Sequence, residues 1–324
     1  MNGAGAQVST RMRFSVGMPG LDRYPAGRVP AWVTEMRAKD FQTIARTADE
    51  LGYHAVNIPE HIVMTDDLVG AMGSHWPHAL TAMAFVAGAT SNIRVNACVI
   101  VLPYHDPIVL AKAAATLDVM SGGRLMLTFG VGHATHEFEA LGVPFHRRGR
   151  IADEYLEAMT ALWTQDAPSY EGEFVSFDGV HFDPKPVQKP HPPLWFGGNS
   201  SAALRRVARY GTGWMPWLIL PEELPARLDE LRGLPGYGDN GEVDIWFPAA
   251  PIRVREEDHE LTGDDLHDQF SSEQEVIDAI GRLHELGATW TTIPFPGAPA
   301  ATTLSEHLDR LAWGAEAVMP LFNR

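Results

Sequence analysis

The sequence predicts one (β/α)8 barrel of the TIM type, from its alternating pattern, the character of its strands and its length. Short apolar runs alternate with longer stretches whose apolar residues recur at helical spacing, as in strands followed by helices. The run at 95–102 is almost wholly apolar, which indicates a strand buried on both faces of a parallel sheet. Parallel strands need helical crossovers, and Asp106 followed by Pro107 marks the start of one. The 324 residues suffice for eight such units.

The predicted elements follow in regular order. Strands are expected at 12–18, 54–59, 95–102, 124–130, 194–196, 213–217, 244–250 and 290–295. Helices are expected between them, at about 32–51, 77–89, 107–120, 151–162, 200–211, 221–234, 272–283 and 305–318. A turn-rich stretch at 166–193 interrupts the alternation before the fifth strand, and the acidic stretch 253–270 has no assignment.

The composition narrows the classes of function. There are 25 Lys and Arg against 41 Asp and Glu, and the net charge of −16 would repel the phosphate backbone of a nucleic acid. No apolar run is long enough to span a membrane, and the start of the chain lacks the basic and apolar parts of a secretory signal. We therefore expect a cytoplasmic protein with a disordered tail at 1–10 and a single domain at 11–324. Neither nucleic acid nor membrane is expected as a partner.

Metal binding is not expected from the cysteine and histidine content. Cys98 is the only cysteine, which excludes an intramolecular disulfide and a cysteine-rich zinc site. His133 and His136 have the spacing of two ligands on one helical turn, with Glu137 next to them. No further ligand cluster stands at a fixed spacing from them, so the sequence favours no metal site.

In a barrel of this type the functional residues follow the carboxyl ends of the strands. After the fifth strand the chain reads Gly197, Gly198, Asn199 and Ser200 and then begins a helix. Glycines let a phosphate approach the backbone N–H groups, and Asn and Ser add donors while they cap the helix. The alternative is an ordinary tight turn between strand and helix.

A basic cluster precedes the helix after the fourth strand. It consists of Arg147, Arg148 and Arg150, which could attract an anionic part of a ligand. Ion pairing within the start of the helix is the favoured interpretation. The expected partners are Asp153, Glu154 and Glu157.

Several segments together resemble a known superfamily. They are Ser121-Gly-Gly-Arg-Leu, Phe129-Gly-Val-Gly, Glu137-Phe-Glu-Ala-Leu-Gly, Asp183-Pro-Lys-Pro-Val-Gln, Trp195-Phe-Gly-Gly-Asn-Ser and Gly211-Thr-Gly-Trp-Met-Pro. In this order, between about residues 13 and 318, they resemble the bacterial luciferase-like flavin oxidoreductases, and more narrowly their coenzyme F420-dependent branch. The resemblance implies a barrel that holds a flavin or deazaflavin at its C-terminal mouth, usually in a homodimer. It also implies hydride transfer to or from a small-molecule substrate.

The resemblance also implies which residues surround the cofactor ring. Relatives have a bulge with a non-proline cis peptide in the third strand, which corresponds here to Ala97, Cys98 and Val99. The match places the cis bond between Ala97 and Cys98; the alternative is a regular buried strand. After the fourth strand, Gly132 and His133 are expected to lie near the ring or the substrate.

Glu60 and His61 follow the second strand. In the sugar-phosphate dehydrogenases of the F420-dependent branch an acid and a histidine at the matching place lie beside the ring. The resemblance therefore implies that His61 acts as a general acid or base and that Glu60 supports the cofactor. Those dehydrogenases carry Asp where this sequence has Glu60. The alternative for His61 is a loop histidine that caps a helix or faces solvent.

Three functional hypotheses remain open at this point. The first is an F420-dependent oxidoreductase that transfers a hydride between the deazaflavin and a small organic substrate. The second is an FMN-dependent monooxygenase on the same fold. The third, from another class, is a non-catalytic flavin-binding barrel or a barrel without a cofactor.

Overall fold

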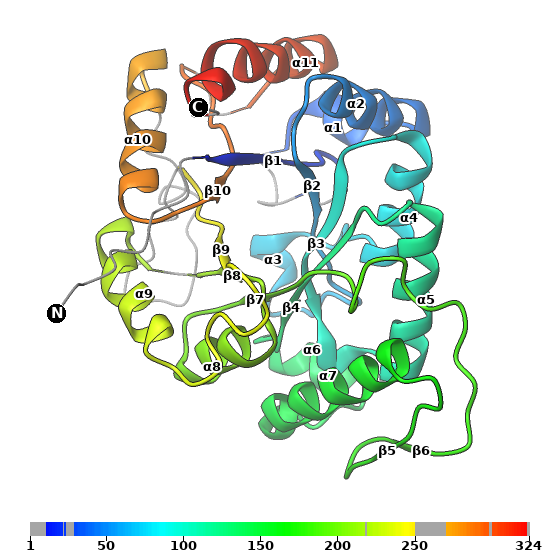
Figure 1. Cartoon of the computed structure of the whole chain (residues 1–324). Coiled ribbons are helices and arrows are strands. Elements are labelled where there is room, and N and C mark those ends of the chain that lie inside the picture. Colours follow the sequence, from blue (N-terminus) through cyan, green and yellow to red (C-terminus); the bar gives the residue numbers. More distant parts are fainter. Residues whose placement is uncertain are drawn as a thin grey trace, which may run out of the picture.

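The protein is a parallel β-barrel surrounded by helices (Figure 1). The computed structural model describes residues 11–21, 23, 29–217, 219–249, 270–297 and 300–322. Its eight barrel strands are β1 (Arg13–Gly17), β2 (Ala55–Ile58), β3 (Arg94–Val101), β4 (Leu125–Gly130), β7 (Leu194–Gly197), β8 (Gly213–Met215), β9 (Asp244–Ile245) and β10 (Trp290–Thr291). They pair in the order β10-β1-β2-β3-β4-β7-β8-β9, with every pairing parallel. The predicted (β/α)8 fold is confirmed.

The barrel closes between β9 and β10. Trp246 and Trp290 form a parallel bridge, and the N–H of Phe247 donates to the Trp290 carbonyl over 2.9 Å. The N–H of Thr289 donates to the Ile245 carbonyl over 2.9 Å. Because β10 also pairs with β1, the strands form a ring in which each has two neighbours.

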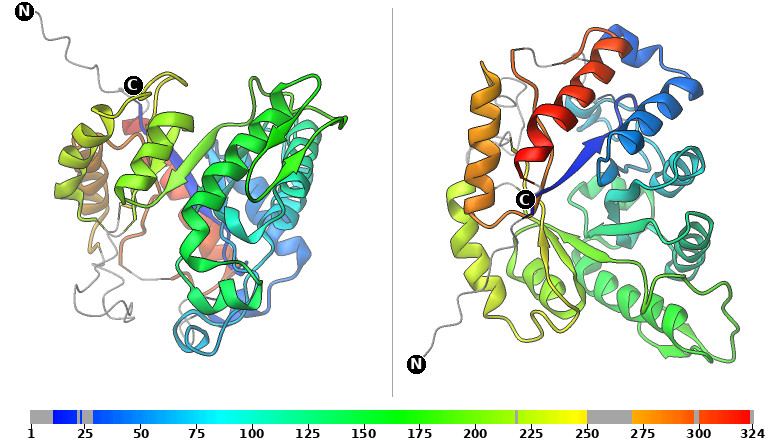
Figure 2. Two further views of the ribbon diagram at one scale, coloured as in Figure 1. Left: turned by 90° about the horizontal axis from the view of Figure 1, so that it is seen from below. Right: turned by 45° about the horizontal axis from the view of Figure 1, so that its top comes forward.

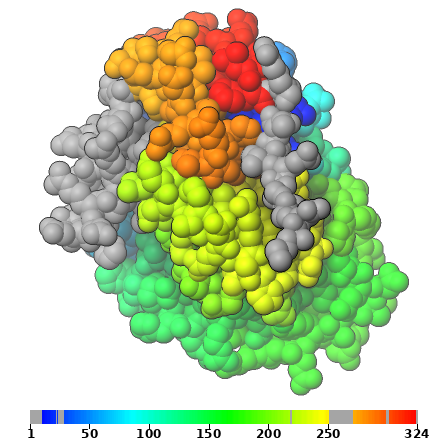
Figure 3. Space-filling model, turned by 60° about the vertical axis from the view of Figure 1, so that its left-hand side comes forward, coloured from blue at the N-terminus to red at the C-terminus, as the bar shows by residue number. Residues whose placement is uncertain are grey.

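The longer helices lie outside the strands, as Figure 2 shows from two further sides, and the short helix α3 lies across one end of the barrel (Figure 1). They are α1 (Ala31–Thr34), α2 (Ala38–Glu50), α3 (Val69–Met72), α4 (Ala79–Ala89), α5 (Pro107–Met120), α6 (Thr135–Ala140), α7 (Arg148–Thr164), α8 (Ser201–Tyr210), α9 (Leu224–Arg232), α10 (Glu273–Glu285) and α11 (Leu304–Trp313), which continues as a π-helical turn to Val318. On the face in Figure 3, α9, α10 and α11 succeed one another from yellow-green to red. None of the helices in the described part of the chain is long and apolar enough to cross a membrane.

The helix starts that the sequence marks are confirmed by their caps. The Asp106 carboxylate accepts the N–H groups of Ile108 and Val109, both over 2.9 Å, and Pro107 occupies the first position of α5. The hydroxyl of Ser272 accepts the N–H of Glu275 at the start of α10. Such caps satisfy N–H groups that have no partner inside the helix, so the breaks between elements are set locally.

The turn-rich stretch before the fifth barrel strand contains a small hairpin, β5 (Tyr170–Glu171) and β6 (Ser176–Phe177). It projects beyond the ring of helices (Figure 1). Glu154 of α7 holds its turn, since the carboxylate accepts three successive backbone N–H groups, at residues 173 to 175, over 2.6 to 2.9 Å. The sequence indicated turns here but not this pairing.

The ion pairs predicted between the arginines at 147–150 and the acids of α7 are wrong. Arg147 and Arg150 pair with Glu173 of the hairpin turn, the latter over 2.6 Å. The acids of α7 are engaged elsewhere: Asp153 pairs with Arg206 and Glu157 with Arg209, both on α8, and Glu154 binds the hairpin backbone. Arg148 donates to the carbonyls of Gly132 and Phe145. The reason is that the hairpin and α8 pack on α7 and offer nearer partners than the next turn of the same helix.

A chain of polar side chains crosses the barrel interior. Thr128 donates to Asn96 over 3.0 Å, Asn96 to Asn57 over 3.0 Å, and Asn57 to the hydroxyl of Ser15 over 2.9 Å. All four are at most 8% exposed, and the indole N–H of Trp246 also donates to Ser15. The interior is therefore filled by packed and hydrogen-bonded side chains, and any ligand must bind at an end of the barrel.

Candidate active site

A buried carboxylate holds His61 at the C-terminal mouth. Glu137 of α6 is 1% exposed, and its Oε2 lies 2.8 Å from Nδ1 of His61. Its Oε1 accepts the N–H groups of Ile62 and Val63 over 2.8 and 3.2 Å, and the hydroxyl of Tyr104 donates to Oε2 over 3.1 Å. Burial opposes ionisation of Glu137, but the hydrogen bonds from His61, Ile62 and Val63 outweigh it and lower the pKa of the carboxyl group.

This contact fixes the tautomer of His61. An ionised carboxylate only accepts, so Nδ1 of His61 carries a hydrogen and Nε2 is left as the basic nitrogen. The ring lies 4.7 Å from the Trp76 ring and 6.5 Å from the His133 ring, both nearly perpendicular to it. His61 therefore presents Nε2 from a ring packed on two sides. The sequence indicated His61 as a candidate. It did not indicate the contact that orients this ring, because Glu137 lies 76 residues further along the chain.

The neighbouring Glu60 takes part in a second acid–histidine pair. Its Oε2 lies 2.8 Å from Nε2 of His105, and its Oε1 accepts the N–H of Ala79 over 3.2 Å. The Glu60 side chain is fully buried, so both of its oxygens are engaged within the protein. His105 was not among the sequence candidates. Its only signal was its position just after the third strand.

His133 and His136 do not converge. His133 stands beside His61 with part of its side chain exposed, and the partial desolvation of its ring, followed by the proximity of His61, lowers its pKa. His136 points elsewhere and pairs with Asp67 over 3.0 Å at the surface. Within the described ranges, no three His, Cys, Asp or Glu side chains are placed to hold a metal ion.

The third strand carries a bulge and a non-proline cis peptide, one bond later than predicted. The cis bond joins Cys98 and Val99, not Ala97 and Cys98. Ala97 and Cys98 still pair regularly with β4, and the register shifts between Cys98 and Ile100. The extra residue of the bulge in the pairing of β3 with β4 is therefore Val99. This position explains why the predicted cis bond between Ala97 and Cys98 is wrong. The thiol of Cys98 donates to the sulfur of Met215 over 3.2 Å.

Glycines make room for the bulge. A Cβ on Gly130 would lie 2.8 Å from Val99, and one on Gly197 would lie 3.2 Å from it. Gly132 has a φ of +76°, and a Cβ there would lie 2.7 Å from Val101. Gly130 and Gly197 thus let Val99 pack directly against the backbone of β4, which is next to β3, and of β7, which is the strand beyond it. This packing explains Gly197 without reference to a phosphate.

The loop after β7 keeps some of its predicted donors. The N–H of Gly198 donates to the Met215 carbonyl over 3.0 Å and is therefore occupied. Ser200 caps α8 by accepting the N–H of Ala203 over 3.2 Å. In the described part of the chain, the N–H groups of Asn199 and Ser200 have no acceptor. These two amides are the donors that remain for a ligand.

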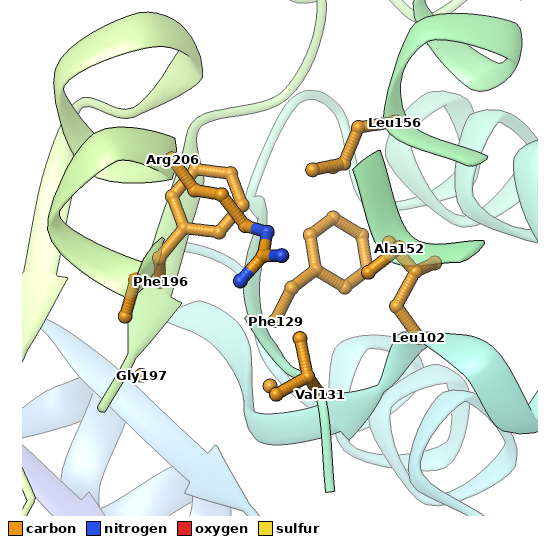
Figure 4. A pocket seen from close by; sticks show the side chains of 10 residues that line it. Leu102, Phe129, Val131, Ala152, Leu156, Phe196, Gly197 and Arg206 are labelled. Carbon is orange, nitrogen blue, oxygen red and sulfur yellow. The ribbon is translucent and has the colours of Figure 1, made fainter. Parts of the chain in front are cut away.

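A small pocket lies behind this loop (Figure 4). Its walls are apolar side chains of β4, β7 and α7 and the buried guanidinium group of Arg206. Arg206 donates from Nε to Asp153 over 2.6 Å and from Nη2 to the Gly149 carbonyl over 2.9 Å. It thereby fixes α8, and with it the loop at 197–200, to α7.

The mouth thus combines a bulged strand, glycines after β4 and β7, and an oriented histidine. Residues 20–314 match a family model described as luciferase-like monooxygenase. The chain belongs to the luciferase-like monooxygenase family. Among curated members, an uncharacterized protein of Mycobacterium tuberculosis is 36% identical over 285 residues, which cover 83% of this chain and 91% of that protein. An FMNH2-dependent dimethylsulfone monooxygenase of Pseudomonas putida is 32% identical over 166 residues, 50% of this chain and 45% of that enzyme.

Solved structures share the luciferase-like fold. The monooxygenase RslO1 from Streptomyces bottropensis has a TM-score of 0.75 at 22% identity, covering 96% of this chain and 100% of that chain. An F420-dependent secondary alcohol dehydrogenase, solved with an F420-acetone adduct, has a TM-score of 0.71 at 18% identity, covering 97% and 100%. The luciferase-like family thus comprises oxidoreductases and monooxygenases, and the neighbours of this chain include F420-dependent and FMN-dependent enzymes.

Proposed function

We propose that this protein is a coenzyme F420-dependent oxidoreductase that transfers a hydride between the deazaflavin and a small organic substrate. The observation that carries the proposal is the pair of His61 and Glu137 at the mouth of the barrel. Oxidation of an alcohol by hydride transfer also releases the hydroxyl proton, and an oriented histidine can take it at Nε2. The fold shared with an F420-dependent secondary alcohol dehydrogenase supports this class of reaction.

The mouth fits a flat, phosphate-bearing cofactor in two respects. Val99 of the bulge fills the space beside the backbone of Gly130 and Gly197, and its half-buried side chain offers an apolar surface to a flat ring. The N–H groups of Asn199 and Ser200 lie at the start of α8, where the helix dipole favours an anion. The proposal assigns the ring to the bulge at Ala97, Cys98 and Val99, with Gly132 and His133 nearby. It assigns the phosphate to the loop from Gly197 through Gly198 to Asn199 and Ser200. When bound, the deazaflavin supplies a ring carbon that accepts or gives a hydride.

The protein supplies orientation and the proton acceptor. Nε2 of His61 takes the hydroxyl proton of the substrate in oxidation and returns it in reduction. Glu137 keeps the hydrogen on Nδ1 and stabilises the ring when it becomes charged. Partial desolvation and the proximity of His61 lower the pKa of His133, which disfavours a second positive charge beside His61.

Glu60 acts indirectly in this scheme. Both of its carboxylate oxygens are engaged, by His105 and by the N–H of Ala79, so it is not free to contact a ligand. We assign Glu60 as a positioning residue that fixes the loop between β2 and α4 against His105. The cofactor support expected from the sequence is then exerted through that loop.

A second candidate function is an FMN-dependent monooxygenase. The 32% identity to the FMNH2-dependent dimethylsulfone monooxygenase, over half of this chain, favours it. FMN would occupy the same mouth and use the same phosphate loop. In either case the proposal includes a small-molecule substrate, a homodimer and a cytoplasmic location.

The first test is an anaerobic titration of the purified protein with F420 and with FMN, followed by the fluorescence of each. Tighter binding of F420, lost in Gly198→Trp and retained in Met120→Trp on the exposed surface of α5, supports the proposal. Preference for FMN moves the assignment to the monooxygenase, and binding of neither leaves a non-catalytic barrel.

The second test concerns the proton. In the F420-loaded protein, His61→Asn is expected to slow reduction of the cofactor by a panel of secondary alcohols about 10²-fold or more. The control is His136→Asn, which removes a surface pair with Asp67 and is expected to leave the rate unchanged. Equal rates in His61→Asn and the wild type would remove His61 from the mechanism.

A further inference from the structure

A second cavity lies at the opposite end of the barrel, where the strands begin. It has a volume of about 560 Å³, which falls within the range of roughly 300–1,000 Å³ usual for sites that bind small molecules. Its walls come from the starts of β1, β3, β4, β7, β9 and β10 and from the loops that precede the strands. They include Arg13, Arg94, His54, Thr212, Trp195 and Trp290. None of these residues belongs to the C-terminal mouth, so the cavity is separate from the proposed cofactor site.

The acidic groups of this cavity already have partners or stand at its rim. Asp244 lies 2.6 Å from Arg13 and accepts the hydroxyl of Thr289 over 3.0 Å. Asp49 accepts the backbone N–H groups of residues 91 to 93 over 2.6 to 3.2 Å. Glu242 is exposed at the rim. The carboxylate groups of Asp49 and Asp244 in the cavity wall therefore already accept hydrogen bonds from the protein.

The donors, in contrast, are in excess. Within the described residues, the guanidinium group of Arg94 makes one hydrogen bond, to Gln188 over 3.2 Å, although it has five N–H groups. Burial and the proximity of Arg13 lower the pKa of Arg94, and together they outweigh the opposite effect of Asp118 and Asp244. An oxyanion placed between Arg13 and Arg94 would relieve both effects.

His54 adds to this surplus, and within the described residues Thr212 has a hydroxyl without a partner behind the cavity wall. Nδ1 of His54 accepts the N–H of Phe14 over 3.2 Å, so the neutral ring carries its hydrogen on Nε2. Burial, followed by Arg11 and Arg13, lowers the pKa of His54 to about 4, which keeps the ring neutral and a donor at pH 7. The hydroxyl of Thr212 is buried without a hydrogen-bond partner in the described part of the chain.

The floor of the cavity is aromatic. The rings of Trp195 and Trp290 meet edge to face at 5.2 Å, and His54 meets Trp290 in the same way at 5.8 Å. The Arg13 guanidinium lies 5.6 Å from the centre of the Trp290 ring. Trp195 and Trp290 are 2% and 4% exposed, so a planar ligand group meets only the small part of the two rings that borders the cavity, while an attached carboxylate turns toward the arginines.

We propose that the N-terminal end of the barrel is a second binding site, for a small aromatic carboxylate held mainly by Arg94. The carboxylate pairs with the guanidinium group, and the ring lies over the tryptophan floor. This site is independent of the proposed reaction and of the cofactor at the mouth.

The test is an NMR titration with benzoate at constant ionic strength, on protein labelled with 15N in its tryptophan indoles. We expect saturable shifts of the Trp195 and Trp290 signals and none at Trp76, which lies at the mouth beside His61. Arg94→Gln should weaken binding about tenfold or more, because a hydrogen-bonded charge pair is lost. The matched control is Arg209→Gln on the surface of α8, with unchanged affinity.

Three results would overturn the proposal: shifts that do not saturate in the wild type, equal affinity in Arg94→Gln, or an equal loss in Arg209→Gln. Folding of each variant is checked by its thermal transition. If Arg94→Gln does not fold, Arg94→Lys keeps the charge but loses the fork of N–H groups, and it must also bind more weakly. Competition by F420 or FMN would place benzoate at the mouth and would equally overturn the assignment.

Discussion

Replacing Glu137 with Gln is the most direct perturbation of the candidate site. All four groups around the carboxylate donate hydrogen bonds: His61, Tyr104 and the backbone N–H groups of Ile62 and Val63. If the new amide turns its NH2 group toward Ile62 and Val63, it faces two backbone N–H groups that can only donate. If it turns the NH2 group toward His61 and Tyr104, both must change from donor to acceptor, and Nδ1 of His61 loses its hydrogen. A hydrogen bond to a buried charged group contributes about 1.5–3 kcal/mol, so we expect a loss of about 2–4 kcal/mol in the free energy of unfolding.

The loss must also depend on pH with a defined sign. The pKa of Glu137 lies below its ordinary value near 4.5 in the folded protein. A group with a depressed pKa stabilises the fold above its unfolded pKa, and this contribution disappears as the pH falls through the folded pKa. The difference between wild type and Glu137→Gln should therefore be complete at pH 7 and should shrink as the pH falls below about 4.5.

Urea unfolding, followed by tryptophan fluorescence at several pH values, measures both effects. Glu139→Gln is the matched control, because Glu139 is an exposed residue of the same helix and should change stability little. The reasoning fails if Glu137→Gln is as stable as the wild type at pH 7. It also fails if the two Gln variants lose the same amount.

Three further predictions concern packing, capping and titration. Gly130→Ala should destabilise the fold by about 1–3 kcal/mol because its Cβ would meet Val99, whereas Gly88→Ala on the open face of α4 should stabilise it by up to about 1 kcal/mol; thermal unfolding of both tests whether the signs differ. Asp106→Ala should cost about 1 kcal/mol through the lost cap of α5, and an unchanged midpoint in urea would contradict this. The ring of His54 should stay neutral down to about pH 4, so that its contribution to stability falls between about pH 6.5 and 4; an NMR titration with a midpoint near 6.5 would disprove the burial argument.

The fold could be predicted from the sequence because its determinants are local. Apolar runs, helical spacing and caps such as Asp106 and Ser272 lie within a few residues of the elements they define. The strand count and the family resemblance both led to the same barrel. The hairpin β5–β6 was missed because each of its strands has only two residues, too short for a visible alternation.

The site could be predicted only in part, because its contacts span distant segments. His61 stood out as a histidine after a strand, but its orientation depends on Glu137, which stands 76 residues later in the sequence. The pairing of Glu60 with His105 joins two loops that the sequence places 45 residues apart. The cis bond was placed one residue early because a bulge position depends on where the ladder with β4 breaks, which the sequence of β3 alone does not state.

The polar chain inside the barrel has a direction. Thr128 donates to Asn96, Asn96 to Asn57, and Asn57 to Ser15, whose hydroxyl points to the carbonyl of Thr291. Each amide group is held in one orientation by its neighbours. Turning Asn57 over would set its NH2 group against that of Asn96, and turning Asn96 over would set the two amide oxygens against each other. A single substitution is then felt around the ring from β4 to β1. Repacking this layer would succeed only if the four side chains were exchanged together.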